Sequence, residues 1–318
     1  MVTVMLGLAV FFALNMGGAS FAASFSAPYG GKILNRFQSA SLFTVFVILG
    51  AVMFGQNVSH TLGESIIPAE LLRSRSVTVI FLSAGLSMFI ANMTNIPQST
   101  SVVTVAVIAG VGLYHQQVTM RTIMWLIPFW LLLPAVSYAI THVIAGYIYP
   151  PRRTNFWIYQ KFVNQRSKLR RFVIIASCYN AFCVGTNNVA NVVGPLSGPG
   201  HVGLVGLLLA FSLVYGAGAF VFSGPIKTAG QKIVPLGLLT ASIISLVSGT
   251  LMLMASWLGI PQSFVMLQMG ALFAVSSIKH GSDYTFENPL IRRTFYTWTV
   301  NPLITLLISY GLSWLIIR

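Results

Sequence analysis

Acidic residues are nearly absent from this chain of 318 residues. It has four Asp and Glu in total, and 7% of its residues are charged against 56% that are hydrophobic. A soluble domain carries about 25% charged residues, so this composition excludes a soluble globular protein. The two cysteines support neither a disulfide framework nor a cysteine-based metal site. The sequence has no Gly-rich phosphate-binding loop ending in Lys-Ser or Lys-Thr, which disfavours an ATP-driven pump.

Basic residues are in excess, with 18 Lys and Arg and a net charge of +14. We do not take this charge to predict nucleic-acid binding, because the basic residues lie between apolar segments. The segment 150–171 holds seven Lys and Arg and no acid, and the positive-inside rule places it on the cytoplasmic side. An anchor to anionic lipids explains the same residues and predicts the same side. The expected partner is therefore the lipid bilayer, with no nucleic acid.

Seven charge-free runs set the number of membrane spans. One span needs about 20 apolar residues, so the shorter runs hold one span and the three longest hold two. The runs are 1–31, 37–63, 76–120, 122–151, 172–226, 233–278 and 294–317. They predict an all-α polytopic protein of about ten spans. Its parts are an N-terminal transmembrane repeat (1–148), a basic cytoplasmic linker (149–171) and a C-terminal repeat (172–318).

The two halves carry matching sequence stretches. "GGASFAASFSAP" (17–28) aligns without a gap with "GTNNVANVVGP" (185–195) at an offset of 168, and "NIPQSTSVV" (95–103) matches "GIPQSFVML" (259–267) at an offset of 164. Two further matches lie at an offset of 172: Arg121-Thr122 with Arg293-Thr294, and Ser137-Tyr138 with Ser309-Tyr310. Two successive copies with an odd number of spans insert with opposite topology, which is the inverted repeat of secondary transporters.

Glycine, alanine and small polar residues in these stretches predict helices broken at the bilayer midplane. Such breaks persist only where protein or a water-filled cavity satisfies the backbone, and exposed helix N-termini attract anions. Each Pro-Gln-Ser predicts a helix start. The other interpretation, that small residues only form helix-packing faces, stays open. The predicted anion-binding residues are Ser20, Ser24, Gln98, Ser99, Thr100, Ser101, Asn187, Asn188, Asn191, Gln262 and Ser263.

Two lysines, Lys227 and Lys232, flank "TAGQ" at the end of a charge-free run. Cations inside a membrane are costly and usually functional, so an inward-facing lysine would attract an anion. Snorkelling of both side chains to the membrane interface is the alternative.

The matched stretches resemble those of the inorganic phosphate transporter (PiT) family. That family carries a duplicated Gly-Ala-Asn-Asp-Val-Ala-Asn-Ala-like signature and a Pro-x-Ser-Thr-Thr-like element in each half. The second copy agrees with the signature at Gly185, Asn187, Val189, Ala190, Asn191, Gly194 and Pro195, and the stretch 224–236 resembles the family's Lys-Thr-x-Gly segment. The resemblance covers nearly the whole chain and implies a transporter with no enzymatic activity, built as re-entrant hairpins that meet at the midplane. It also suggests a homodimer.

Departures from the family pattern point to the substrate. The signature aspartate is replaced by Ser20 in the first copy and by Asn188 in the second, and the first copy has Ala19 and Ala23 in place of both asparagines. Phosphate keeps a proton near pH 7 and can donate it to a carboxylate, whereas sulfate only accepts hydrogen bonds. A pocket of donors without a carboxylate therefore favours sulfate, and the bacterial sulfate-permease branch (CysP type) of the family is similar in this respect. Thiosulfate, selenate and molybdate satisfy the same argument.

A dianion that enters a negative-inside cell must be accompanied by a cation. Loss of both carboxylates weakens the case for sodium, so we expect protons as the coupling ion and no cofactor. The candidate proton carriers, each of which is equally a loop residue, are Glu64, Glu70, Asp283, Glu287, His115 and His142. The prediction is thus proton-coupled sulfate uptake across a bacterial cytoplasmic membrane. Its alternative is sodium- or proton-coupled symport of inorganic phosphate.

Overall fold

The computed structural model describes residues 1–94, 98–150, 152–198, 203–222 and 237–318, and within these ranges it is helical without strands. The first half contains α1 (Val2–Gly30), α2 (Arg36–His60), α3 (Ser74–Thr94), α4 (Thr100–Tyr114) and α5 (Met120–Ile148), with two single turns, η1 (Thr61–Ser65) and η2 (Ala69–Leu71), between α2 and α3. The second half contains α7 (Arg166–Asn188), α8 (Ala190–Leu196), α9 (Leu204–Val221), α10 (Leu238–Trp257), α11 (Phe264–His280), α12 (Ser282–Glu287) and α13 (Pro289–Ile316).

Eight helical segments of the described chain are long and apolar enough to cross a membrane. Two more apolar helices, α4 and α11, have 15 and 17 residues. At about 1.5 Å per residue they are shorter than the hydrocarbon core of about 30 Å. The multi-pass membrane protein predicted from the charge-free runs is confirmed. Of the about ten spans predicted, eight are helices long enough to cross, and the other two correspond to these short helices.

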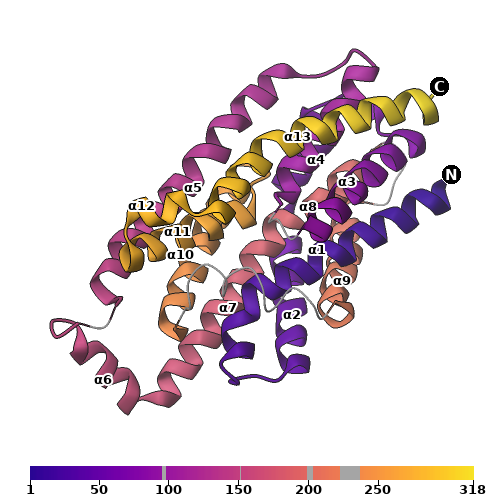
Figure 1. Ribbon diagram of the computed structural model, residues 1–318. Helices are drawn as coiled ribbons and strands as arrows, with labels where there is room; N and C mark the ends of the chain where they lie inside the picture. The colour runs from indigo at the N-terminus through magenta and orange to yellow at the C-terminus, as the bar shows by residue number, and fades with distance from the viewer. Residues whose placement is uncertain (95–97, 151, 199–202, 223–236) are drawn as a thin grey trace.

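The short helices each form a hairpin with the preceding helix, and the two hairpins enter from opposite ends (Figure 1). At the start of α3, Arg75 donates to the carbonyls of Ile317 and Arg318, and at the end of α4 the Tyr114 ring lies 5.5 Å from that of Trp314. Hairpin α3–α4 therefore begins and ends beside the C-terminus. Hairpin α10–α11 begins and ends toward the other end, where α12 lies.

Equivalent contacts in the two halves support the repeat. The Cβ position of Gly17 on α1 faces the Tyr215 carbonyl of α9, and that of Gly185 on α7 faces the Val47 carbonyl of α2. The two carbonyl residues, Val47 and Tyr215, differ by 168 positions, as the two glycines do. Ser137 of α5 donates to the carbonyl of Leu267 in α11, and the matching Ser309 of α13 donates to that of Val107 in α4, about one turn from the residue that matches Leu267. These similar contacts are consistent with two related copies.

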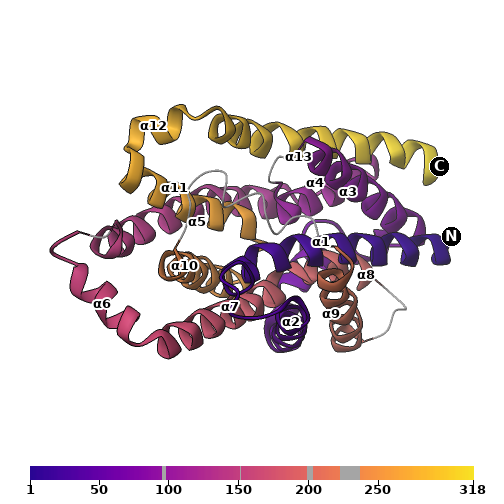
Figure 2. The ribbon, with the colours of Figure 1, turned by 60° about the horizontal axis from the view of Figure 1, so that its bottom comes forward.

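The two halves also run in opposite senses. Both termini lie at one end of the molecule, whereas α6 (Phe156–Asn164), which connects the halves, lies at the other (Figures 1 and 2). Helix α1 therefore starts at the end that carries the termini, and α7 starts at the end that carries α6. This is the arrangement that an inverted repeat requires.

The helix break predicted at the first glycine-rich stretch is wrong, and the one predicted at the second is limited to a single residue. Helix α1 is continuous through residues 17–28, and the second copy is interrupted only at Val189, whose φ of −62° and ψ of −33° are still helical values. The glycines instead allow backbones to touch: a Cβ at Gly17 would lie 1.8 Å from the Tyr215 oxygen, and one at Gly185 would lie 2.2 Å from the Val47 oxygen. Close helix packing, the other interpretation of these residues, is the correct one.

The breaks occur at the second matched element. Helix α4 begins at Thr100 with Ser99 as its N-cap, and α11 begins at Phe264 with Ser263 as its N-cap. Pro261 precedes its cap by two residues and is not in the first helical turn. The prediction that each Pro-Gln-Ser is followed by a helix start is confirmed, because the hydroxyls of Ser99 and Ser263 cap free N–H groups of the first turn. Pro97 lies outside the described residues.

Candidate functional site

The two signature positions that lack the family aspartate lie side by side in the interior. The Ser20 hydroxyl accepts hydrogen bonds from Asn188 Nδ2 at 3.4 Å and from the Tyr215 hydroxyl at 2.6 Å, and Asn188 Nδ2 also lies 3.3 Å from the Tyr215 oxygen. All three side chains are buried. Because Ser20 accepts both bonds, its own proton is left to be donated to another group. The halves of the chain are therefore joined by a small uncharged polar cluster.

The hairpin tips meet beside this cluster. Asn191 Nδ2 donates to the Ser101 hydroxyl at 3.0 Å, and Ser101 donates to the backbone carbonyl of Gln262 at 2.9 Å. Ser101 belongs to hairpin α3–α4 and Gln262 to the connection before α11, so this chain of bonds links both hairpins to α8. Asn191 lies one helical turn after Asn188 and faces the same interior.

Each hairpin presents a capped helix N-terminus at its tip. The Ser99 hydroxyl accepts from the Val102 N–H at 3.2 Å, and the Ser263 hydroxyl accepts from the Met266 N–H at 3.2 Å. The other N–H groups of a first turn have no partner within the helix and carry partial positive charge. The two starts therefore point donors inward from opposite ends of the molecule.

Several buried polar atoms in this region have no hydrogen-bond partner within the described residues. They are Oδ1 of Asn188 and of Asn191, both amide atoms of Gln262, and the hydroxyl of Ser24. Buried polar groups in native proteins are almost always paired with protein or with ordered water. The atoms of Asn188, Asn191 and Gln262 belong to the side chains described above, so a polar ligand or water bound there would give them partners.

Two predicted residues, Asn187 and Gln98, have structural partners instead. Asn187 Nδ2 donates to the Ser256 hydroxyl and the Ile260 carbonyl, and its Oδ1 accepts from the Gln262 N–H. This side chain therefore holds the α10–α11 connection to α7. Gln98 Nε2 donates at 2.5 Å to the Ser87 hydroxyl, which also contacts α13. Thr100 is the first, half-buried residue of α4.

Two predicted lysines, Lys227 and Lys232, lie outside the described residues.

Two buried residues were missed by the sequence reasoning: Tyr215, which contacts both signature positions, and Ser256, which contacts Asn187. Neither stands in a matched stretch. A tyrosine and a serine within apolar helices are the only signal that the sequence gives for them.

The acidic side chains lie on the surface of the protein and not in this buried region. All four acids of the chain lie within the described residues, and all are exposed. The one ion pair with an acid that the described residues form joins His60 and Glu64 near the end of α2, where both side chains are more than half exposed. The interior cluster is therefore built from uncharged side chains and, within the described residues, contains no carboxylate.

Two matching helical halves that enclose a buried, uncharged polar cluster are the organisation typical of membrane transport proteins. Comparison with known families agrees, because residues 16–309 match the phosphate transporter family (PHO4). The chain belongs to that family, and it is a transporter and not an enzyme.

Individual relatives include transporters of two oxyanions. The sulfate permease CysP of Bacillus subtilis is 30% identical over 97% of this chain and 86% of its own length. A putative phosphate permease of Methanocaldococcus jannaschii is 21% identical over 93% of this chain and 91% of its own length. The solved structure of a sodium-dependent phosphate transporter has the same fold, with a TM-score of 0.83 over 99% of this chain and 98% of that chain, at 20% identity.

Removing the Ser101 hydroxyl, which links the hairpin tips, should lower the stability of the protein. In Ser101→Ala, the Asn191 amide loses its acceptor and the Gln262 carbonyl loses its donor. We expect the free energy of unfolding to fall by about 1–2 kcal/mol, measured as a lower thermal midpoint in detergent. Ser26→Ala is the matched control because Ser26 lies in the first signature stretch but is exposed. An equal drop in both variants would contradict the assigned bonds.

Proposed function

We propose that this protein takes up sulfate, or a closely related tetrahedral oxyanion, by proton symport through alternating access. The observation that carries the proposal is the contact between Ser20, Asn188 and Tyr215, three buried uncharged groups at the junction of the repeats. The sulfate would lie near this cluster and the hairpin tips, with Gln262 and Asn191 as further donors. Lys227 and Lys232 remain candidates for attracting the anion.

Hydrogen-bond chemistry supports sulfate over phosphate. Sulfate has acceptors only, and amide N–H groups, hydroxyls and helix N-termini satisfy them. Phosphate with a bound proton also requires an acceptor, and the strongest acceptor, a carboxylate, is missing at positions 20 and 188. The name of the 30% identical relative, a sulfate permease, points the same way. Several other relatives are called phosphate permeases, so phosphate symport is the alternative to test.

Energetics require a coupling ion. Moving one negative charge inward against 100 mV costs about 2.3 kcal/mol, so sulfate, with two charges, costs about twice as much. Import of protons with the anion offsets this cost. Sodium coupling is less favoured because no carboxylate stands at the two signature positions to bind the cation.

Orientation follows from the basic linker. If residues 149–171 face the cytoplasm of a bacterial inner membrane, both termini lie outside, because they are at the opposite end of the molecule from α6. Hairpin α3–α4 then enters from outside and hairpin α10–α11 from the cytoplasm. A homodimer, suggested by the family resemblance, remains part of the proposal.

The experiment is uptake into proteoliposomes. Purified protein is reconstituted, and accumulation of labelled sulfate and labelled phosphate is measured under an imposed inward proton gradient, an inward sodium gradient, or neither. We expect sulfate accumulation that depends on the proton gradient and is competed by unlabelled sulfate more strongly than by phosphate. Empty liposomes are the control.

Each other outcome has a defined meaning. Phosphate uptake that sulfate does not compete would overturn the substrate assignment, and uptake driven only by sodium would overturn the coupling ion. Flux that does not saturate with substrate would indicate a channel in place of a transporter.

A further inference from the structure

A pair of equivalent glycines shows that helices α10 and α3 pack differently at matching positions. Gly249 of α10 and Gly85 of α3 are related by the hairpin offset of 164. A Cβ at Gly249 would lie 3.3 Å from the Tyr179 ring and 3.4 Å from Cys183 Sγ, both on α7. A Cβ at Gly85 would meet nothing within 4 Å. Helix α10 thus contacts α7 at Gly249, whereas α3 leaves open space toward α1 at Gly85, one turn from the place where its Phe81 ring packs 5.9 Å from that of Phe12.

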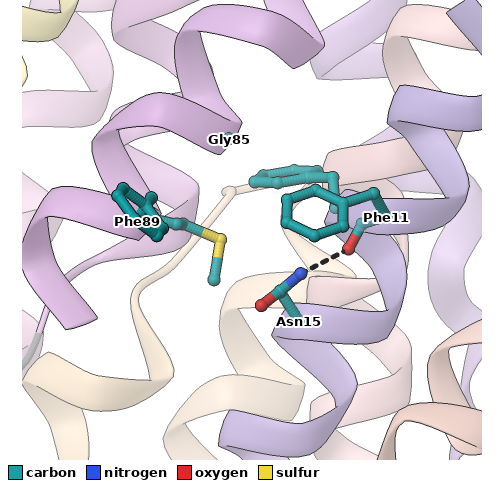
Figure 3. A pocket seen from close by; sticks show the side chains of 6 residues that line it. Phe11, Asn15, Gly85 and Phe89 are labelled. Atoms are coloured by element: carbon teal, nitrogen blue, oxygen red, sulfur yellow. Dashed lines mark hydrogen bonds between the residues drawn. The ribbon is translucent and has the colours of Figure 1, made fainter. Parts of the chain in front are cut away.

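The space beside Gly85 is a cavity between α1 and α3 (Figure 3). A cavity of about 30 Å³ is lined by Phe11 and Asn15 of α1 and by Gly85 and Phe89 of α3, and it lies beside an apolar groove of about 170 Å³. Phe11 and Asn15 are the repeat equivalents of Tyr179 and Cys183, at the offset of 168. The residues that would touch Gly85 in a closed hairpin therefore line the open space.

Side-chain hydrogen bonds explain why only the second hairpin is closed. The Tyr179 hydroxyl lies 3.0 Å from the Thr250 hydroxyl, the Thr186 hydroxyl lies 2.7 Å from that of Ser256, and Asn187 also donates to Ser256. All of these bonds tie α7 to α10. The residues of α1 at the matching positions are Phe11, Gly18 and Ala19, whose side chains have no hydrogen-bonding group. At these three positions, α1 therefore offers α3 no side-chain hydrogen bond of the kind that ties α10 to α7.

The opened face of α1 leads toward the candidate site. Ala19 lies one helical turn beyond Asn15 and is exposed, whereas its equivalent, Asn187, is buried. Ser20 is the next residue. Closing α3 onto this face would cover the side of α1 next to Ser20.

We propose that helix α3 is a moving gate of this transporter and that, in each transport cycle, α3 closes onto α1 through a contact at Gly85 like the one that α10 makes on α7 at Gly249. The inference rests on the proposed transport function. Alternating access in transporters built from inverted repeats moves one part of the protein against another around the site, and the contact at Gly249 shows a packing that the matching helices can adopt. In the orientation proposed above, this gate opens to the outside.

The test is a side chain that fits only the open state. In Gly85→Val, the added atoms enter open space in the structure described, but they would collide with Phe11 and Asn15 after closure. We expect folded protein at the parental yield and thermal midpoint, with uptake at least tenfold lower. Gly311→Val is the matched control: Gly311 is also a helical glycine with nothing within 4 Å of its Cβ position, but it lies on α13. Its uptake should stay within twofold of the parent.

A second variant separates blocked closure from misfolding. Phe11→Ala makes room in the closed contact, so Phe11→Ala combined with Gly85→Val should recover at least half of the uptake that Phe11→Ala alone retains. Gly85→Val with parental uptake, or a loss that Phe11→Ala does not relieve, would overturn the gate. The assay uses whichever of sulfate and phosphate the parent accumulates. A wrong substrate assignment would thus change the anion and leave the ratio between variant and parent unaffected.

Discussion

Ser20→Asp is expected to abolish sulfate uptake, whereas Ser20→Ala should lower it only severalfold. Two unit charges 4 Å apart repel by about 4 kcal/mol at an effective dielectric of 20. That energy corresponds to a loss of affinity of about 1,000-fold, at about 1.4 kcal/mol per tenfold. Ser20→Ala removes one hydrogen-bonding group, which contributes about 1 kcal/mol, or about fivefold in affinity.

The Asp variant should still fold. Its carboxylate can accept the hydrogen bonds that Asn188 Nδ2 and the Tyr215 hydroxyl donate to Ser20. The measurement is equilibrium binding of labelled sulfate to purified Ser20→Asp and Ser20→Ala, with elution profile and thermal midpoint as checks on folding. Ser26→Asp, at an exposed position on the same helix, controls for added charge. Parental sulfate affinity in folded Ser20→Asp would place Ser20 outside the binding site.

Gly17→Val should prevent accumulation of folded protein. A Cβ at Gly17 would lie 1.8 Å from the Tyr215 carbonyl oxygen and 2.7 Å from its carbonyl carbon. Both sides of this contact are helix backbone, so neither can move away by changing a rotamer. We expect a loss of at least about 4 kcal/mol, which is at the upper end for single substitutions. The readout is the amount of monodisperse protein after detergent extraction.

Gly7→Val is the control for this effect. It places the same side chain on the same helix, at a glycine whose Cβ position has nothing within 4 Å. Its helix-propensity change is equal, so a difference in yield between the two variants reports the backbone contact. Comparable yields of Gly7→Val and Gly17→Val would mean that α1 and α9 do not pack as described.

Together these substitutions separate the two properties of the first signature stretch. Gly17 serves close packing between the repeats, whereas Ser20, one turn later, supplies a polar group to the interior. A single run of small residues therefore has a packing position and a polar position, and the polar one is the position that we propose for binding. Loss of folded protein identifies the first, and loss of sulfate affinity in folded protein identifies the second.

The sequence by itself determined the class of protein, the repeat and the meeting of positions 20 and 188. Charge-free runs locate the spans because a charged side chain is costly in hydrocarbon. The repeat offsets place Ser20 and Asn188 at equivalent positions, and Pro-Gln-Ser marks the starts of α4 and α11. These features are local or periodic, so they are visible without knowledge of what packs against them.

Only the tertiary structure decided what the glycines do, which polar groups are satisfied and how the hairpins differ. A glycine-rich run permits a broken helix or a close helix contact, and the choice depends on the facing backbone, here the carbonyls of Tyr215 and Val47. In the same way, Asn187 and Asn188 are adjacent in the chain, but they point to different partners, so one holds α10 in place and the other joins Ser20. Contacts between segments that are distant in sequence leave no local pattern, and they become evident only after the helices have packed.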